Sequence, residues 1–171
     1  AIWYYNVGCR DEAAIVLTLS PHTAETVYWL SFLQNKKVNY GEIKPAFSFP
    51  SRWESAYVIE KVLAVQDNWL LKFHLALIYK DRNRVEECIS LLTSCGDTPD
   101  FAPFYAVRAE ILRGKDDAQC EKDLKKALSL DNQWRYHQYL ANYYISQSQY
   151  DKALDITGPL YKPPPEDFRM G

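Results

Sequence analysis

The chain has 171 residues, of which 47% are hydrophobic and 25% are charged, and its formal net charge at pH 7 is −2. This length suffices for one domain with a sizeable core, or for about four to five helical repeats. The charge balance gives no electrostatic reason to expect nucleic acid or an anionic membrane as partner. With only 6 glycines, the composition is typical of a folded helical protein and argues against disorder.

The sequence begins with a truncated repeat, about residues 1–20. A helix stub is followed by a turn at Gly8 and by a short helix over residues 11–19, which Ser20 and Pro21 end. Because the chain starts inside a repeat and without Met, we expect it to be a fragment of a longer protein. Targeting signals of that parent protein would then lie outside this sequence.

The second repeat, about residues 21–67, is irregular. Thr23 can cap a helix that runs to about residue 37, and a second helix is predicted over residues 51–66. The connecting segment between them, residues 38–49, contains Gly41 and Pro45, so we expect an extended loop.

The connecting segment also carries three aromatic residues, Tyr40, Phe47 and Phe49. A long loop in a regular repeat array is often functional. The alternative is that Phe47 and Phe49 tuck under the loop and fill the gap that the insertion makes.

Three more regular repeats follow, at about residues 68–100, 101–132 and 133–165. Asn68 can cap the first of their helices. The predicted helices cover residues 69–80 and 85–94, then 102–113 and 117–129, then 133–146 and 150–160. The prolines at 163–165 stop the last one.

A small residue in the second helix of each repeat measures the period. These residues are Ala13, Ser55, Cys88, Cys120 and Ala153. Their numbers differ by 42, 33, 32 and 33, so one repeat is about nine residues longer than the others. A residue that favours a turn stands shortly before most of them, at Gly8, Asn83, Gly114 and Ser148. A fixed period of this size indicates stacked helix pairs, each too small to hold a core alone.

The third and fifth repeats resemble tetratricopeptide repeats (TPRs), whose pattern is W-x2-L-G-x2-Y, then A-x3-F, then P. The residues that match are Leu75, Ala76, Tyr79, Cys88 and Leu92 in the third repeat, and Leu140, Ala141, Tyr144, Tyr150, Ala153 and Pro165 in the fifth. The pattern's Trp is replaced by Lys72 and His137, and its Phe by Thr157. The resemblance implies an all-α, right-handed α-α superhelix of about five helix pairs, the first of them truncated.

A finer resemblance concerns residues 47–54, FSFPSRWE, preceded by Tyr28-Trp29-Leu30. This stretch is similar to the C-terminal repeat region of large bacterial proteins in which a β-rich N-terminal domain, associated with carbohydrate, precedes the repeats. The resemblance implies that the chain is the scaffold half of a two-part protein.

In a TPR array, the first helices of the repeats line the concave face. Residues of these helices outside the Leu-Ala-Tyr stripe form the predicted binding face: Tyr28, Phe32, Asn35, Phe73, Leu77, Lys80, Arg135, Gln138 and Asn142. Such a mixed surface suits an extended or helical protein segment. The alternative is that they are ordinary solvent-facing or inter-repeat residues. Leu70 and Leu77 stand where a clamp for a partner's C-terminal carboxylate would need polar groups, which argues against such a clamp.

Enzyme chemistry has little support in the sequence. There is no glycine-rich phosphate loop and no G-x-S-x-G motif. The 4 cysteines form no C-x-x-C pair and the 3 histidines are scattered, so we expect no metal site and no cofactor. Cys88 and Cys120 are predicted to be small buried residues. No apolar run approaches the roughly 18 residues that span a membrane.

The sequence therefore predicts a non-enzymatic scaffold that binds a protein or peptide partner on its concave face. Two alternatives remain open. The chain could be an accessory repeat domain that packs on a carbohydrate-active or carbohydrate-binding domain of the same parent chain. It could also be a self-association module, because its aromatic faces and its open first repeat could drive homo-oligomers. The sequence assigns no cellular compartment.

Overall fold

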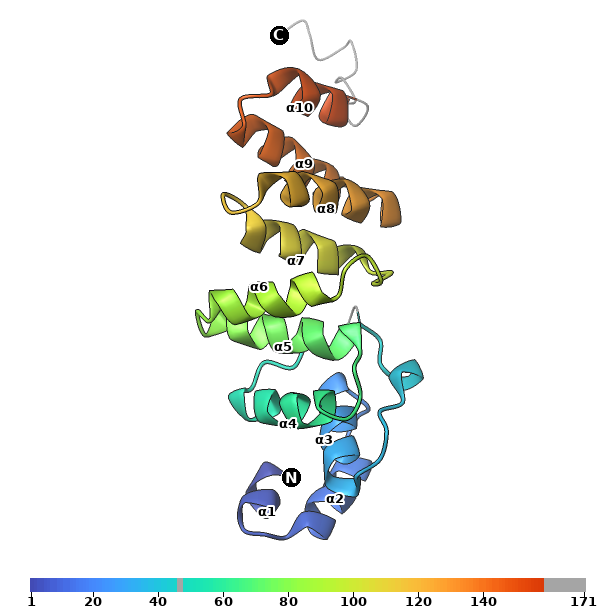
Figure 1. Cartoon of the computed structure of the whole chain (residues 1–171). Coiled ribbons are helices and arrows are strands. Elements are labelled where there is room, and N and C mark those ends of the chain that lie inside the picture. Colours follow the sequence, from blue (N-terminus) through green and yellow to red (C-terminus); the bar gives the residue numbers. More distant parts are fainter. Residues whose placement is uncertain (46–47, 159–171) are drawn as a thin grey trace, which may run out of the picture. The chain divides into compact units, whose positions relative to one another are not determined.

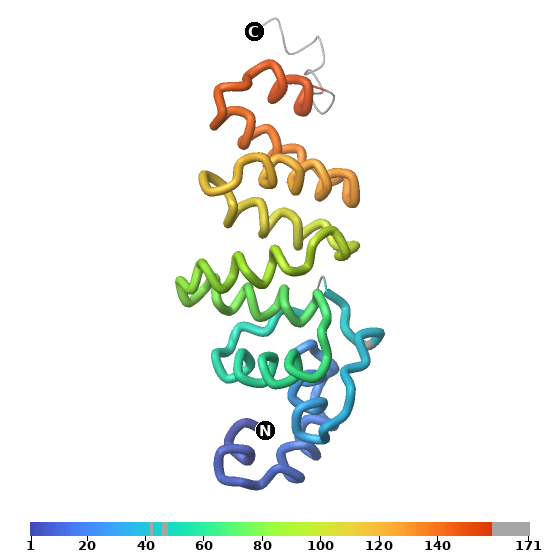
Figure 2. The backbone as a smooth tube through the Cα atoms, viewed as in Figure 1, coloured from blue at the N-terminus to red at the C-terminus, as the bar shows by residue number. Residues whose placement is uncertain are grey.

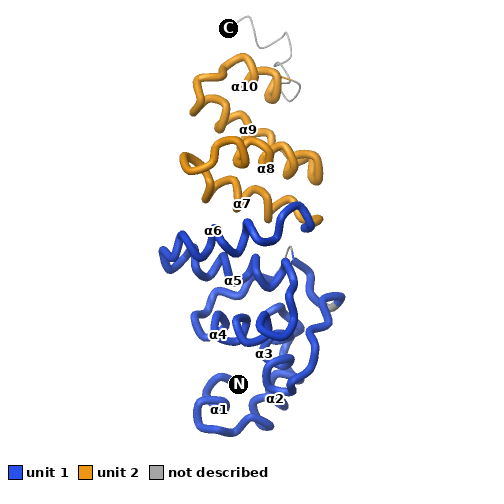
Figure 3. The backbone as a smooth tube through the Cα atoms, viewed as in Figure 1, with its two compact units in different colours: residues 1–99 blue, residues 100–171 orange. Residues whose placement is uncertain are grey.

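The computed structural model describes residues 1–45 and 48–158. Within these residues the chain is all-α, with ten α-helices, one short 3-10 helix and no strand (Figure 1). The predicted all-α class is confirmed. Two compact units divide the chain, an N-terminal unit of residues Ala1–Pro99 and a C-terminal unit of residues Asp100–Gly171 (Figure 3).

In the N-terminal unit, each helix packs against the next one along the chain. The helices are α1 (Ile2–Asn6), α2 (Arg10–Thr18), α3 (Ala24–Gln34), α4 (Trp53–Leu63), α5 (Trp69–Asp81) and α6 (Val85–Ser94), with η1 (Tyr40–Glu42) between α3 and α4. The predicted Thr23 cap is present, since Thr23 Oγ1 accepts a hydrogen bond from Thr26 N at 3.2 Å. However, α3 ends three residues earlier than predicted, because Asn35 adopts a left-handed backbone conformation.

The C-terminal unit repeats this arrangement with four helices, again packed in chain order. They are α7 (Ala102–Leu112), α8 (Asp117–Leu130), α9 (Trp134–Ser146) and α10 (Tyr150–Thr157). The helices predicted over residues 69–146 are confirmed to within one residue at each end. Helix α10 ends at Thr157, and residues 159 and 160, where its end was predicted, lie outside the described part of the chain.

The turns between helices lie at the predicted turn residues. Gly8, Asn83, Gly114 and Ser148, the four predicted turn residues, all have positive φ angles, between 57° and 87°. At three of these turns the residue after the turn residue donates a backbone hydrogen bond to the carbonyl of a tyrosine five residues earlier: Cys9 to Tyr4, Arg84 to Tyr79 and Gln149 to Tyr144. This closing pattern ends α1, α5 and α9 in the same way.

Helix α3 closes with the same pattern, which places the irregular second repeat in register. Lys36 N donates to Ser31 O at 3.0 Å, and Asn35 has the left-handed conformation. Ser31 therefore occupies the place of Tyr79 and Tyr144. By the same count, Tyr28 occupies the place of Ala76 in the next repeat.

The residues that measured the period are all buried. The exposed fraction is 0% for Ala13, Cys88 and Cys120, 1% for Ser55 and 6% for Ala153. Cys88 and Cys120 are thus small core residues, as predicted. In the C-terminal unit, one apolar cluster joins α7 to α10 through Ala109, Cys120, Leu140, Ala141 and Ala153.

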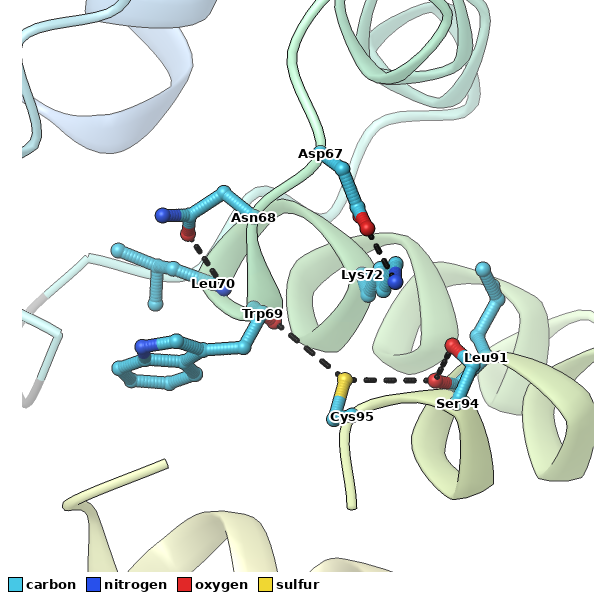
Figure 4. Close-up of polar contacts among 8 residues, drawn as sticks. All are labelled: Asp67, Asn68, Trp69, Leu70, Lys72, Leu91, Ser94 and Cys95. Carbon is cyan, nitrogen blue, oxygen red and sulfur yellow. Dashed lines mark hydrogen bonds and ion pairs between the residues drawn. The ribbon is translucent and has the colours of Figure 1, made fainter. Parts of the chain in front are cut away.

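Polar contacts fix the ends of the α5–α6 pair (Figure 4). Asn68 Oδ1 accepts a hydrogen bond from Leu70 N at 2.8 Å, which confirms the predicted cap of α5. Lys72, which stands at the tryptophan position of the TPR pattern, forms an ion pair with Asp67 at 2.7 Å. The Cys95 thiol donates to Leu91 O at 3.3 Å and lies 4.0 Å from Trp69 O, so it closes the far end of α6 onto the start of α5.

The connecting segment between α3 and α4 makes a long excursion in the N-terminal unit (Figure 2). It is anchored rather than loosely extended. Val38 N donates to Gln66 Oε1 at 2.9 Å, Ile43 is 6% exposed, and Ser48 Oγ accepts from Ala24 N at 2.6 Å. The sequence predicted an extended loop but not these anchors, nor the turn η1. Phe47 lies outside the described residues.

Candidate functional site

The C-terminal unit contains a groove of about 540 Å³ between its two first helices, α7 and α9. Ala106 and Val107 line one wall, Tyr136 and Tyr139 line the other, and Leu124 of α8 forms the floor. Tyr139 is 44% exposed, whereas Tyr136 is 2% exposed. The volume lies within the range of typical ligand pockets, and the centre of the groove is apolar.

Polar groups stand at the two ends of the groove. Arg135 lies at the start of α9, while Glu110, Arg113 and Asn142 lie toward the ends of their helices. Arg135 forms an exposed ion pair with Asp131 at 3.3 Å, and its guanidinium lies 4.9 Å from the centre of the Tyr136 ring. An apolar centre with polar ends can hold a protein segment by its side chains and fix its direction.

Two predicted residues, Arg135 and Asn142, line this groove, but the residues of α7 were missed. The repeat period could have found them. Counted back 32 residues, the predicted residues of the fifth repeat fall on Pro103, Ala106 and Glu110, and all three line the groove. Gln138 itself is exposed on α9 and is not part of the lining.

The equivalent face of α5, in the N-terminal unit, is filled. Phe73 and His74 are 1% and 0% exposed, and the Phe49 ring from the connecting segment lies 6.5 Å from the ring of Phe73 and 6.0 Å from that of His74. The prediction that Phe73 belongs to a solvent-facing surface is therefore wrong, because Phe49 covers it. Leu77 and Lys80, the other two predicted residues of α5, are half-buried.

Tyr28 is also buried, with 1% exposed, so it does not face a ligand as predicted. The physical reason is its register: it occupies the place of Ala76, which points into the core. The Tyr28 side chain reaches α5, where a hydrogen bond of 2.8 Å joins Tyr28 Oη and His74 Nδ1. Burial lowers the pKa of His74 to about 4 and raises the pKa of Tyr28.

The last two predicted residues, Phe32 and Asn35, line a second hollow of about 300 Å³ in the N-terminal unit. It lies at the end of α3 and beside α4, and we call it the lysine pocket because Lys36, Lys37 and Lys61 line it. Of the nine predicted residues, four thus line a hollow, two are core residues, and Leu77, Lys80 and Gln138 do neither.

The ionisable groups with large pKa shifts belong to the packing of the helices. Tyr79 donates a hydrogen bond to Glu60 and lies under the Arg84 guanidinium, and burial raises its pKa to about 12. Within residues 1–45 and 48–158, no three His, Cys, Asp or Glu side chains lie close enough together to hold a metal ion. None of the helices described there is long and apolar enough to cross a membrane.

No protein-family model matches the chain, and no curated protein does. Solved structures do. MamA, residues 41 to the end, from Desulfovibrio magneticus RS-1 has a TM-score of 0.57 at 16% identity, covering 91% of this chain and 86% of that one. A structure of MamA AMB-1 has a TM-score of 0.58 at 17% identity, with 92% and 84% covered.

The chain therefore has a TPR-like fold, with helices packed sequentially in pairs. It is a helical repeat protein similar in structure to MamA over more than 90% of its length. At 16% and 17% identity this similarity concerns the fold, and TPR-like folds are shared by proteins with different partners.

Proposed function

We propose that the chain is a non-enzymatic scaffold that binds a segment of a protein partner in the groove between α7 and α9. The observation that carries this proposal is the open groove itself. The matching face of α5 is filled by Phe73, His74 and Phe49, whereas Ala106 and Val107 leave the groove unfilled. An unfilled apolar groove in an otherwise well-packed repeat is typical of a binding site.

The lining favours an extended or helical peptide over a small polar substrate. Val107, Leu124 and Tyr139 offer apolar surface, while the Asn142 amide can pair with a peptide backbone. Among the described residues that line the groove, no nucleophilic side chain is paired with a general base. The function that this site supports is therefore binding without catalysis.

Selection of peptides from a displayed library of random 12-residue sequences tests the proposal. The variant Ala106→Phe introduces the side chain that fills the equivalent place at Phe73. Peptides selected on the unmodified protein should bind this variant at least about tenfold more weakly, because the ring occupies the groove. The control Ala118→Phe adds the same ring at an exposed position of α8 and should bind normally. Equal binding by all three proteins would refute the proposal.

Self-association remains the second candidate, and one surface favours it. Ile145, Tyr150 and Leu154 are 51%, 61% and 67% exposed and line a further hollow of about 230 Å³ against Ala141 and Ala153. Light scattering at increasing protein concentration distinguishes this candidate. A mass that rises with concentration, and that Leu154→Lys returns to the monomer value, would support it.

Packing on a neighbouring domain of the same parent chain is the third candidate. It is favoured by exposed apolar side chains on α1, on α2 and directly after α2: Trp3 is 68%, Ile15 59% and Leu19 84% exposed. The resemblance to repeat regions that follow a carbohydrate-associated domain motivates the same idea. The test is hydrogen exchange of the full-length parent protein, in which α2 should be better protected than in the isolated chain.

A further inference from the structure

We propose that the lysine pocket of the N-terminal unit is a second binding site, specific for an acidic protein segment. A carboxylate of that segment would lie among Lys36, Lys37 and Lys61, and a neighbouring apolar side chain would lie against Phe32, Val62 and Val65. This site is separate from the groove between α7 and α9, so the inference goes beyond the proposed function.

The pocket is formed by backbone that is held in place. Ser31 Oγ donates to Lys36 O at 2.5 Å, and Lys36 N donates to Ser31 O at 3.0 Å. Two residues further, both backbone polar groups of Val38 bond to the Gln66 side chain, at 2.9 and 3.4 Å. The two lysines in between therefore project from a fixed stretch of chain, which reduces the entropy lost on binding.

The three ammonium groups have no acidic partner. In the described part of the chain, none of Lys36, Lys37 and Lys61 forms an ion pair, and no Asp or Glu lines the pocket. Lys61 lies instead 5.3 Å from the centre of the Tyr57 ring, which is itself 47% exposed. Three positive charges that line one hollow with no acidic residue among them attract an anion.

In the next repeat, which is regular, the basic residue at the position of Lys36 has an acidic partner. Arg84 follows the left-handed turn of α5 as Lys36 follows that of α3, and Arg84 forms an ion pair with Glu87 at 3.0 Å. In the second repeat, the connecting segment replaces the helix that would carry such a glutamate. The charge of Lys36 is thus left to a group from another molecule.

The apolar wall favours a protein segment over other anions. Phe32 is half-buried, Val62 is 4% exposed and Val65 is 82% exposed, so an apolar surface borders the charges. An Asp or Glu flanked by leucine presents both kinds of group to such a surface. A nucleic acid would need a longer basic track, and the chain as a whole carries a net charge of −2.

Fluorescence polarisation with three labelled octapeptides tests the proposal. One alternates Leu with Glu and has an amidated C-terminus, one alternates Leu with Gln and has a free C-terminal carboxylate, and one alternates Leu with Gln and is amidated. The proposal predicts that the Glu peptide binds and that the amidated Gln peptide does not. Binding of the free-carboxylate Gln peptide as tightly as the Glu peptide would identify a terminal carboxylate as the recognised group, still at this pocket.

Charge-reversal variants locate the binding. Lys36→Glu combined with Lys61→Glu should weaken binding of the Glu peptide by about tenfold or more, since two attractions become repulsions. Lys122→Glu combined with Lys126→Glu, the same change of charge at two exposed positions of α8, should leave it unchanged. Raising the salt concentration should weaken binding to the unmodified protein.

Three results would overturn the proposal. One is equal binding of all three peptides, which would show that only the leucines matter. Another is unchanged binding in the double variant when circular dichroism shows it folded. The third is full competition by inorganic phosphate at the concentration of the peptide, which would assign the pocket to a phosphate group instead.

Discussion

Helix α5 of the N-terminal unit and helix α7 of the C-terminal unit are each the first helix of a repeat, but the same face is covered on α5 and open on α7. On α5, Phe73 and His74 are buried under Phe49 from the connecting segment. On α7, the matching residues are Ala106 and Val107, and they line an open groove. The comparison teaches that an insertion and larger side chains can fill a helix face that stays open in another repeat. A site is therefore read from the departures between repeats as much as from their common pattern.

The two units also bury different polar pairs. In the N-terminal unit the pair is uncharged, Tyr28 with His74. In the C-terminal unit it is charged: Arg108 donates to Asp123 twice, from Nε at 2.7 Å and from an Nη at 2.6 Å. Arg108 stands where the neighbouring repeats have Leu75 and Leu140. A charge at an apolar repeat position is tolerated only because its partner is equally buried.

The largest expected effect comes from breaking this charged pair. Asp123→Ala leaves the Arg108 guanidinium buried without its carboxylate, and it should lower the free energy of unfolding by about 3–5 kcal/mol. Urea denaturation monitored by circular dichroism measures the change. The double variant Arg108→Leu with Asp123→Ile copies the fifth repeat, which has Leu140 and Ile156, and should recover most of the loss. If the double variant is as unstable as Asp123→Ala, an apolar pair cannot take the place of the Arg108–Asp123 ion pair in this repeat.

The uncharged pair should make the N-terminal unit sensitive to acid. Burial lowers the folded-state pKa of His74 from 6.5 to about 4, so between these values the unfolded chain binds more protons. Stability is therefore greatest above pH 6.5 and falls as pH drops toward 4, by up to about 3 kcal/mol. Unfolding measured at pH 7.5 and 4.5 should show this loss, and His74→Gln should reduce it. An equal loss in that variant would assign the pH dependence to other groups.

The register of Tyr28 leads to a smaller effect at its counterpart Ala141. Tyr28 has room because its ring extends to His74, whereas Ala141 is 3% exposed and belongs to a close-packed cluster with Ala153. Ala141→Trp should therefore destabilise the chain by about 1–3 kcal/mol through overpacking. Thermal unfolding measures it, with Ala118→Trp on the exposed face of α8 as control. An unchanged melting temperature would contradict the repeat register.

The smallest effect concerns the turn of the fifth repeat. Ser148 has a φ of 58°, a left-handed conformation that costs a residue with a Cβ roughly 1 kcal/mol, whereas Gly8 holds the same place in the first repeat without that cost. Ser148→Gly should therefore raise stability by up to about 1 kcal/mol, less the entropy that glycine adds to the unfolded chain. Chemical denaturation compares it with Gln138→Gly, at an exposed position inside α9, which should destabilise instead.

Most of the fold could be predicted from the sequence, because periodicity and turn chemistry are local signals. The small residues from Ala13 to Ala153 and the turns at Gly8, Asn83 and Ser148 placed most helix ends, but α4 (Trp53–Leu63) is two and three residues shorter at its ends than the predicted helix over residues 51–66. The end of α3 at Gln34 was missed, since the residues before Asn35 are all compatible with a continuing helix. Its closing pattern with Ser31 became visible only from the hydrogen bonds.

The candidate site was less predictable for a physical reason. Which face of a first helix meets solvent depends on what covers it, and Phe49 reaches Phe73 and His74 only through the fold of the connecting segment. The period did contain the residues of α7, since Ala106 and Glu110 lie one repeat before Gln138 and Asn142. The lysine pocket could not be foreseen, because Lys61 lies 24 residues after Lys37 and the intervening segment is irregular.

Chemical-shift mapping tests the central claim most directly. A peptide selected on the unmodified protein is titrated into the ¹⁵N-labelled chain, and the amide shifts of α5, α7 and α9 are followed. We predict the largest changes at Ala106, Val107 and Tyr139, and small changes on the filled face of α5 around Phe73. Changes concentrated on α5, or on the exposed face of α8, would contradict the claim that the open groove between α7 and α9 is the binding site.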